Sequence, residues 1–312
     1  MFPRLTLFLA LALTAFMLSA QNYKVTVDRN IQDVRGAKSA VFSATNASPA
    51  HQTIILELTG GSYLRANSSL PVITTIGPGR TNLITLTEVN GAPGYTYKYV
   101  EGCLGTKPKE VVYLLPVAPG KQTRIDTLSN VNTLYFGRQH PENWLAFSMT
   151  AEPGDTIFAS RRGMVTKVES EQVSEIKSGL TYSSYRTHLI VEHEDCTRAN
   201  YELFEKEGIM VAEGQYVEAG EPLGLVQDGK AYVSGAHLRF MVYYPDLTRD
   251  VLKGIMKSNG FPYAFKYISP LFLGVGIPES GKTYTSEHPE DIITQEMSKR
   301  EIKRWKKEKS ER

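Results

Sequence analysis

Six histidines are the side chains best suited to bind a metal or move a proton in this 312-residue chain: His51, His140, His188, His193, His237 and His288. No CxxC or HExxH spacing accompanies them. His188 and His193 are an odd number of positions apart, so on one strand they face opposite sides. His237 and Arg239 lie two positions apart in SGAHLRF, residues 234–240, and are expected to share a face. Histidine spacing alone therefore gives no metal site.

The first third of the chain has the pattern of a small β-sandwich. Short apolar and β-branched runs alternate with turn signals such as Gly60-Gly61 and Pro119-Gly120. The runs cover residues 40–45, 53–58, 82–89, 96–100 and 111–117. We predict an Ig-like β-sandwich domain over residues 21–120, with no catalytic group in it.

Strands with frequent glycine turns continue beyond this domain. Glycines punctuate residues 154–235, where tight turns need residues that tolerate positive φ. A β-rich stretch with few helical patterns follows to about residue 284, which gives a second β-domain over residues 121–285. Residues 286–312 differ in character: from Lys299 onward there are eight basic and three acidic residues. This tail is predicted to form a short, frayed basic helix that is either solvated or docks electrostatically to an acidic surface.

Residues 1–20 have the features of a secretory signal peptide. Arg4 precedes an apolar run from Leu5 to Leu18, and Ala20 stands at a suitable cleavage site. The alternative, a retained membrane anchor, is disfavoured because the run is short for a bilayer span. We therefore expect a periplasmic or extracellular protein. Cys103 and Cys196 could form a disulfide there, although the sequence leaves their pairing open.

Four sequence blocks carry a resemblance to a known family. Residues 195–226, DCTRANYELFEKEGIMVAEGQYVEAGEPLGLV, are the longest, and the others are YLLP at 113–116, GDTIFASRRGMV at 154–165 and SGAHLRF at 234–240. Together they resemble the LytM/lysostaphin-type zinc endopeptidases (peptidase family M23, duplicated hybrid motif). The resemblance implies an all-β fold: a sandwich, a LytM-type β-domain and a basic C-terminal helix. A lipoyl-type carrier domain has a similar glycine pattern, but it works in the cytoplasm, which the secretion signal contradicts.

The resemblance also implies where a catalytic zinc would be held. Its ligand positions fall on His140, Ser148 and Arg239, and the positions of two assisting histidines fall on Leu203 and His237. A guanidinium has no lone pair for a metal, and its charge repels Zn²⁺. Leucine cannot transfer a proton. We therefore expect no zinc and no other cofactor, although active relatives use zinc, and no catalytic residue.

The groove of the fold is expected to persist with altered charge. Arg239 beside His237 would place a positive charge where the metal stood, and Arg161 would add to the same rim. Arginine suits carboxylate recognition, so His237, Arg239 and Arg161 form the candidate ligand groove. The alternative is that Arg239 pairs with a nearby acid of the protein and binds nothing.

Three functions follow from the resemblance and the composition. The first is a non-catalytic envelope protein that binds peptidoglycan peptides or regulates a wall hydrolase. The others are an active zinc endopeptidase with an unusual ligand set and a structural envelope module docked through the basic tail. The nearly balanced charge, 35 basic against 33 acidic residues, argues against nucleic acid as a partner.

Overall fold

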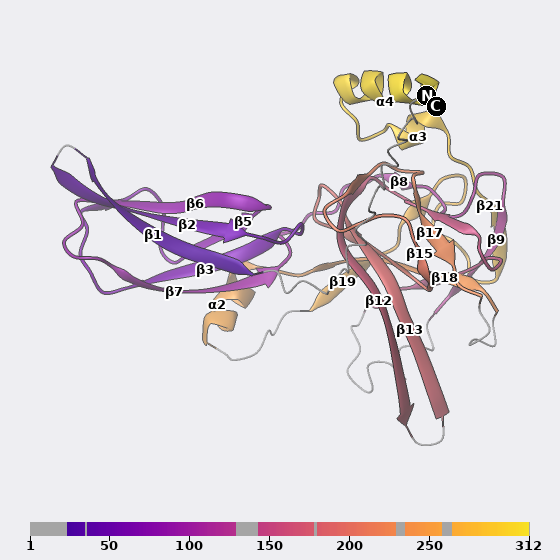
Figure 1. Ribbon diagram of the computed structural model, residues 1–312, viewed down its shortest axis with the longest axis horizontal. Helices are drawn as coiled ribbons and strands as arrows, with labels where there is room; N and C mark the ends of the chain where they lie inside the picture. Colours follow the sequence, from indigo (N-terminus) through magenta and orange to yellow (C-terminus); the bar gives the residue numbers. More distant parts are fainter. Residues whose placement is uncertain are drawn as a thin grey trace, which may run out of the picture.

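The computed structural model describes residues 24–34, 36–128, 143–177, 180–228, 235–257 and 264–311. These residues form two β-rich bodies and a helical C-terminal segment (Figure 1). The prediction of a mostly β protein with a short C-terminal helix is confirmed. The expected signal peptide and His140 lie outside the described residues. Within the described ranges, every helix is too short or too polar to cross a membrane.

The N-terminal body consists of two antiparallel sheets that face each other. One has the order β1-β2-β6-β4 and the other β5-β3-β7. Their strands are β1 (Val25–Val34), β2 (Ala37–Asn46), β3 (Gln52–Thr59), β4 (Arg65–Ala66), β5 (Val72–Ile76), β6 (Gly79–Thr87) and β7 (Gly94–Glu101). Alternating apolar residues of both sheets, among them Phe42, Ile54 and Ile84, form a core with almost no solvent exposure.

The second body is built around a nine-stranded sheet. Eight strands have the order β16-β12-β13-β14-β18-β10-β9-β21, and the ninth, β19, pairs with β18. Smaller sheets, β11-β17-β15 and β20-β8, complete it. Its core includes Tyr113 and Val117, so it begins before the domain boundary expected at residue 120. The strands are β8 (Val112–Tyr113), β9 (Gln122–Thr127), β10 (Phe147–Thr150), β11 (Thr156–Phe158), β12 (Gly163–Lys177), β13 (Leu180–Glu192), β14 (Arg198–Glu202), β15 (Phe204–Ile209), β16 (Tyr216–Val217), β17 (Pro222–Val226), β18 (His237–Pro245), β19 (Phe265–Ile268), β20 (Leu271–Phe272) and β21 (Lys282–Thr285).

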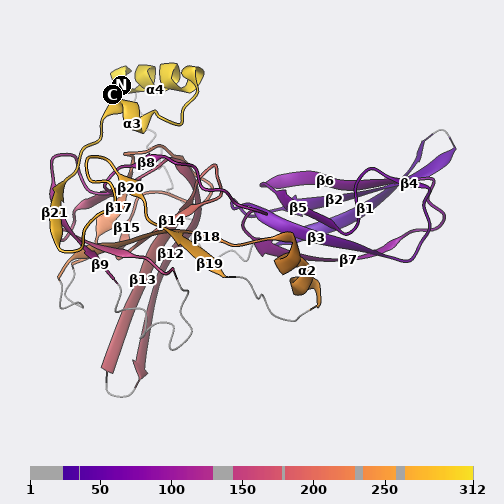
Figure 2. The same cartoon turned by 180° about the vertical axis from the view of Figure 1, so that it is seen from behind.

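Strands β12 and β13 form a long two-stranded arm. Their pairing runs without interruption from Lys167 opposite Ile190 to Lys177 opposite Leu180. The arm projects from the second body on the side opposite the C-terminal helix, as both views show (Figures 1 and 2). The sequence analysis did not single out this hairpin, because its outer part is polar and gives no core-facing pattern.

Helix α2 (Arg249–Lys257) is a departure from the expected β-rich stretch. It belongs to the second half of the chain, yet it lies beside β3 and β7 of the N-terminal body in both views (Figures 1 and 2). Leu252 and Ile255, one helical turn apart, are buried against Ile55, Ile73 and Val100. The helix thus covers the outer face of the β5-β3-β7 sheet and joins the two bodies.

A disulfide between Cys103 and Cys196 also joins the two bodies, across 93 positions of sequence. The pairing that the sequence left open is therefore present in the structure. Next to it, the Glu192 carboxylate accepts hydrogen bonds from the backbone N–H of His51 at 2.9 Å and from the Arg198 guanidinium at 2.7 Å. The two bodies are consequently held together by a disulfide, by polar contacts of Glu192 and by apolar packing of α2.

The C-terminal segment contains helix α3 (Glu290–Ile293) and helix α4 (Lys299–Glu311). The predicted basic helix is α4, which is continuous over its 13 residues. The residues before it are packed on the second body: Met297 is buried, and the Gln295 side chain bonds both the N–H and the C=O of Val112. The tail is therefore anchored at its start and exposed along most of α4.

Candidate ligand groove

Six polar residues form one continuous row across the large sheet, each directly opposite the next in strand register. The row, which we name the charged row, consists of Asp126, Ser148, Arg239, Glu202, His188 and Glu169. Directly opposed residues of an antiparallel pair point to the same face of a sheet. Every member is partly exposed. The row therefore lines one open face of the sheet.

Strand alternation explains why the row is polar and its neighbours are not. Ile125, Phe147, Leu238, Tyr201 and Leu189, each next to a member of the row, point to the other face and are buried in the second core. The apolar face fixes the register, because a slip by one residue would bury the charges. The core of the second body thus determines which polar residues meet in the row.

Charge alternates in sign along the row. Arg239 has Ser148 opposite it on β10 and Glu202 opposite it on β14. Glu202 also accepts a hydrogen bond from the Asn200 amide at 2.8 Å. At the row's ends, Asp126 pairs with Arg124 at 3.0 Å and Glu169 lies 3.3 Å from the His188 imidazole. A ligand on this face would meet both acidic and basic groups.

His237 lies on the same face as Arg239, because it occupies the position two residues earlier on β18 and pairs with Thr150. Its Nδ1 is 2.8 Å from the carbonyl oxygen of Gly235, so this nitrogen carries the proton and donates. Burial lowers the pKa of His237, and the charge of Arg239 lowers it further. The imidazole is consequently neutral at pH 7.

Leu203 follows β14 directly and turns away from the groove. Its side chain is 3% exposed, and its backbone N–H donates to the carbonyl of Thr187 at 2.9 Å. Its φ of 80° lies in the left-handed region, which is uncommon for a residue with a branched side chain. Leu203, which the sequence analysis placed at the position of an assisting histidine, is thus a core residue.

Arg161 is not part of the groove, and its assignment to the rim was wrong. Its side chain is fully buried, and its guanidinium donates to both carboxylate oxygens of Glu296, at 2.8 and 2.7 Å. It also donates to Asp195 at 3.0 Å and to the Tyr113 hydroxyl at 3.2 Å. The residue is occupied in joining the second body to the C-terminal segment, so it offers no donor to a ligand.

The groups gathered in the groove do not fit a catalytic zinc. Ser148 and Arg239, the residues expected at two of the three ligand positions, lie directly opposite each other, and a guanidinium cannot coordinate a metal. Elsewhere in the described ranges, only one set of three His, Cys, Asp or Glu side chains has its potential ligand atoms close enough together to share a metal ion. It consists of His51, Cys103 and Cys196. Both of those sulfurs are consumed by the disulfide. No metal-dependent step can be derived from the described residues.

Sequence reasoning found Ser148, Arg239 and His237 but missed Glu202 and His188. These two enter the row only through the pairing of β13 and β14 with their neighbours. The available signal was strand alternation, since Glu202 and His188 each stand between two buried neighbours. Placing them in one line requires the strand order, which the sequence does not give.

Comparisons with known proteins concern mainly the second body. Residues 142–251 match the model of peptidase family M23. Among solved structures, the chain is similar to a LytM protein from Ruminococcus gnavus (13% identity, 50% of this chain, 57% of that chain, TM-score 0.30). It is also similar to a zinc-containing peptidase from Vibrio cholerae (15%, 68% and 54%, TM-score 0.32) and to Csd3 from Helicobacter pylori (14%, 93% and 83%, TM-score 0.30).

The chain therefore spans just over half of the first two of these structures. The sequence matches none of the curated proteins. The family match covers β10 to the first residues of α2, which includes Ser148, Leu203, His237 and Arg239. Residues 142–251 thus match peptidase family M23, whose LytM-type members the sequence motifs resemble.

Proposed function

We propose that this chain is a non-catalytic M23-type protein of the bacterial cell envelope that binds peptides of peptidoglycan along the charged row. The observation that carries the proposal is the direct opposition of Arg239 and Ser148, at two positions where an active relative holds its metal. A fixed cation there cannot activate water through a metal, but it can bind a carboxylate.

The alternating signs of the row suit peptides that carry both carboxylates and amines, as peptidoglycan peptides do. Arg239 offers a donor for a carboxylate, and Glu202 and Glu169 offer acceptors for an ammonium group. An unbroken strand register holds these groups at fixed spacing. A purely acidic ligand would be repelled by three of the six members of the row: Asp126, Glu202 and Glu169.

An envelope location is supported by two features of the chain. The Cys103–Cys196 disulfide is stable in an oxidising compartment such as the periplasm or the cell exterior. The apolar run at residues 5–18 is suited to secretion.

The test compares binding of defined peptidoglycan peptides by the full chain and three variants. Arg239→Glu should weaken affinity at least tenfold, and Arg239→Lys, which keeps the charge but loses the fork of donors, by a smaller factor. Arg65→Glu on β4 of the N-terminal body makes the same charge change far from the row and should leave affinity unchanged. Equal affinity of Arg239→Glu and Arg65→Glu would refute the proposal, as would stoichiometric zinc together with hydrolysis of cross-linked peptidoglycan by the purified protein.

A further inference from the structure

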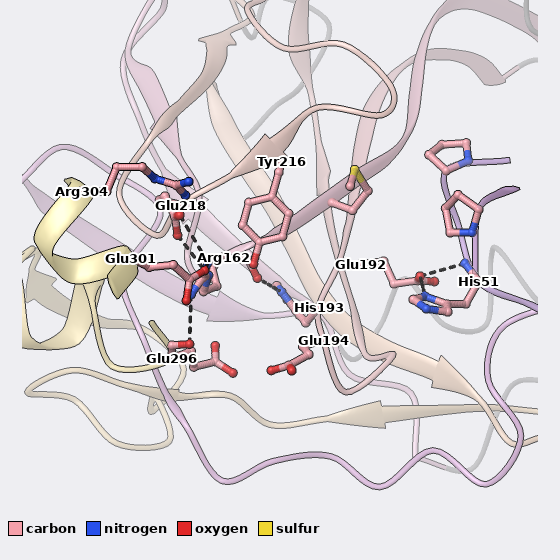
Figure 3. A pocket seen from close by; sticks show the side chains of 13 residues that line it. His51, Arg162, Glu192, His193, Glu194, Tyr216, Glu218, Glu296, Glu301 and Arg304 are labelled. Carbon is pink, nitrogen blue, oxygen red and sulfur yellow. Dashed lines mark hydrogen bonds and ion pairs between the residues drawn. The ribbon is translucent and has the colours of Figure 1, made fainter. Parts of the chain in front are cut away.

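A pocket of about 570 Å³ lies where the N-terminal body, the second body and the C-terminal segment meet (Figure 3). The N-terminal body contributes His51 and two prolines, and the C-terminal segment contributes Glu296, Glu301 and Arg304. None of the residues that line it belongs to the charged row. Its volume is within the range of small-molecule sites, which are usually largely formed before the ligand arrives.

The walls of this pocket are held in place by contacts between the three parts of the chain. The Arg162 guanidinium donates to the Glu301 carboxylate at 2.8 Å and to the carbonyl oxygen of Glu296 at 2.9 Å. On the other side, the His51 imidazole lies 2.7 Å from Glu192. Binding of a ligand would therefore not carry the entropic cost of ordering these side chains.

His193 forms part of the lining and has one nitrogen without a hydrogen-bond partner among the described residues. Its side chain is almost wholly buried, and its Nδ1 is 2.7 Å from the carbonyl oxygen of Arg162. A carbonyl only accepts, so Nδ1 carries the proton and Nε2 presents a lone pair. No described residue donates to that Nε2. Burial, with the nearby charge of Arg161, lowers the pKa of His193 to about 4, so Nε2 is an acceptor at pH 7.

Glu218 supplies a second acceptor, a buried carboxylate oxygen that an ion pair alone holds. Its Oε2 is buried and receives no hydrogen bond from a described residue, although the Arg162 Nε lies 3.0 Å away in an ion pair. Burial raises the pKa of this carboxyl against the opposing charge of Arg162. Buried acceptors without donors are rare in folded proteins and call for a donor from a ligand or water.

The charge and the surface of the pocket narrow the class of ligand. Five carboxylates line it against two guanidinium groups; the carboxylates are Glu192, Glu194, Glu218, Glu296 and Glu301. Glu192, Glu194 and Glu296 are each paired with a cation outside the lining, so the charge is nearly balanced. The two buried acceptors therefore select for a ligand that donates hydrogen bonds. Tyr216, whose side chain is 45% exposed, and Met164 supply apolar surface for a short hydrocarbon arm. No three potential metal ligands of the described residues cluster here, which disfavours a metal ion.

We propose that this pocket binds a small organic ammonium ion, a primary amine on a short hydrocarbon arm, through donation to Glu218 and to Nε2 of His193. The same chemistry is offered by a free diamine and by the side-chain amine of a lysine-like residue in a peptide. The bound amine would bridge Glu218 and His193 of the second body, next to the lining residues that the C-terminal segment contributes. This site is independent of peptide binding along the charged row.

Calorimetric titration of the full chain with 1,5-diaminopentane and with lysine amide tests the proposal. We expect saturable binding of both, at one site per chain, and no binding of 1,5-pentanediol or glutarate at the same concentrations. A preference for lysine amide over the diamine would indicate a peptide as the source of the amine. Absence of heat and of any chemical-shift change with both amines, or equal binding of the diol, would overturn the proposal.

Variants locate the site. Glu218→Gln removes one charge at the pocket and should weaken diamine binding at least tenfold, whereas Glu287→Gln, an exposed change outside the pocket, should have no effect.

Nitrogen NMR of the His193 side chain provides a readout that does not depend on a variant. Its Nε2 resonance should shift when the amine donates to it, and an unchanged resonance at saturation would remove His193 from the site.

Discussion

The Arg161 guanidinium, which has no solvent exposure, donates to both carboxylate oxygens of Glu296, 135 positions later in the chain. This bidentate ion pair fixes the start of the C-terminal segment on the second body. Asp195 provides the second acid to the same guanidinium at 3.0 Å. Removal of one partner from such a pair leaves a buried charge without full compensation.

Glu296→Gln should therefore lower the free energy of unfolding by about 3 kcal/mol, since it weakens a buried bidentate pair. It should also expose the tail to proteases. Urea unfolding and limited proteolysis measure the two effects. The control is Glu308→Gln, which removes an exposed partner of Arg304 and should cost less than about 0.5 kcal/mol. Equal losses in the two variants would contradict the buried pair.

Reduction of the Cys103–Cys196 disulfide should destabilise the whole chain. The disulfide joins residues 93 positions apart, and breaking it raises the conformational entropy of the unfolded state. The chain-entropy argument gives about 4.6 kcal/mol for a loop of this length. Thermal unfolding with and without reductant measures the loss, and the Cys103→Ser, Cys196→Ser double variant should match the reduced protein. If reductant releases two thiols but leaves the melting temperature unchanged, the prediction is wrong.

His193 should make the protein less stable in mild acid. Its folded pKa, about 4, lies below its unfolded value of 6.5, so protonation favours the unfolded state as pH falls below about 6.5. A difference of this size corresponds to about 3 kcal/mol lost by pH 4. Comparison of unfolding free energies of the native chain and His193→Gln isolates this contribution. The variant should show a flatter slope between pH 6.5 and 4, and parallel slopes would exclude the effect.

His51 should act in the opposite pH range. The hydrogen bond with Glu192 raises the pKa of His51, although burial offsets part of the shift. A raised folded pKa means that its contribution to stability is complete below about pH 6.5 and disappears as pH rises through the folded pKa. The stability advantage of the native chain over His51→Ala should therefore shrink from pH 6 to pH 9. An advantage that grows over this range would show that the pair does not titrate as inferred.

Restoring metal ligands at the groove should restore affinity for zinc. The Ser148→Asp, Arg239→His double variant places a carboxylate and an imidazole directly opposite each other on β10 and β18. We expect at least a tenfold gain in zinc affinity over the native chain, measured by competition with a chromogenic chelator. The Ser148→Asn, Arg239→Gln variant removes the same guanidinium without adding a metal ligand of this kind, and should show no gain. A folded double variant with native zinc affinity would mean that the groove geometry has diverged from that of active relatives.

The sequence predicted the β-rich architecture and the strand face shared by His237 and Arg239, because both follow from local alternation. It could not predict the charged row, since Glu202 and His188 reach Arg239 only through the order of strands. It also missed α2, whose apolar positions acquire meaning only against Ile55 and Val100 of the other body.

Arg161 illustrates the remaining limit most clearly. Its neighbours in sequence do not distinguish an exposed rim arginine from a buried one. Arg161 is buried because it pairs with Glu296. Glu296 belongs to the C-terminal tail, for which the sequence predicted only a charged character. Long-range ionic contacts of this kind leave no local pattern.

The position of α2 has a consequence for the order in which the chain folds. Ile55, Ile73 and Val100 of the N-terminal body are covered by a helix that is translated some 150 positions after the last of them. Domains usually fold in the order in which they leave the ribosome. Here the β5-β3-β7 sheet must wait, with one apolar face exposed, until residues 249–257 emerge. Nascent chains of this protein should therefore be clients of chaperones that shield apolar surface.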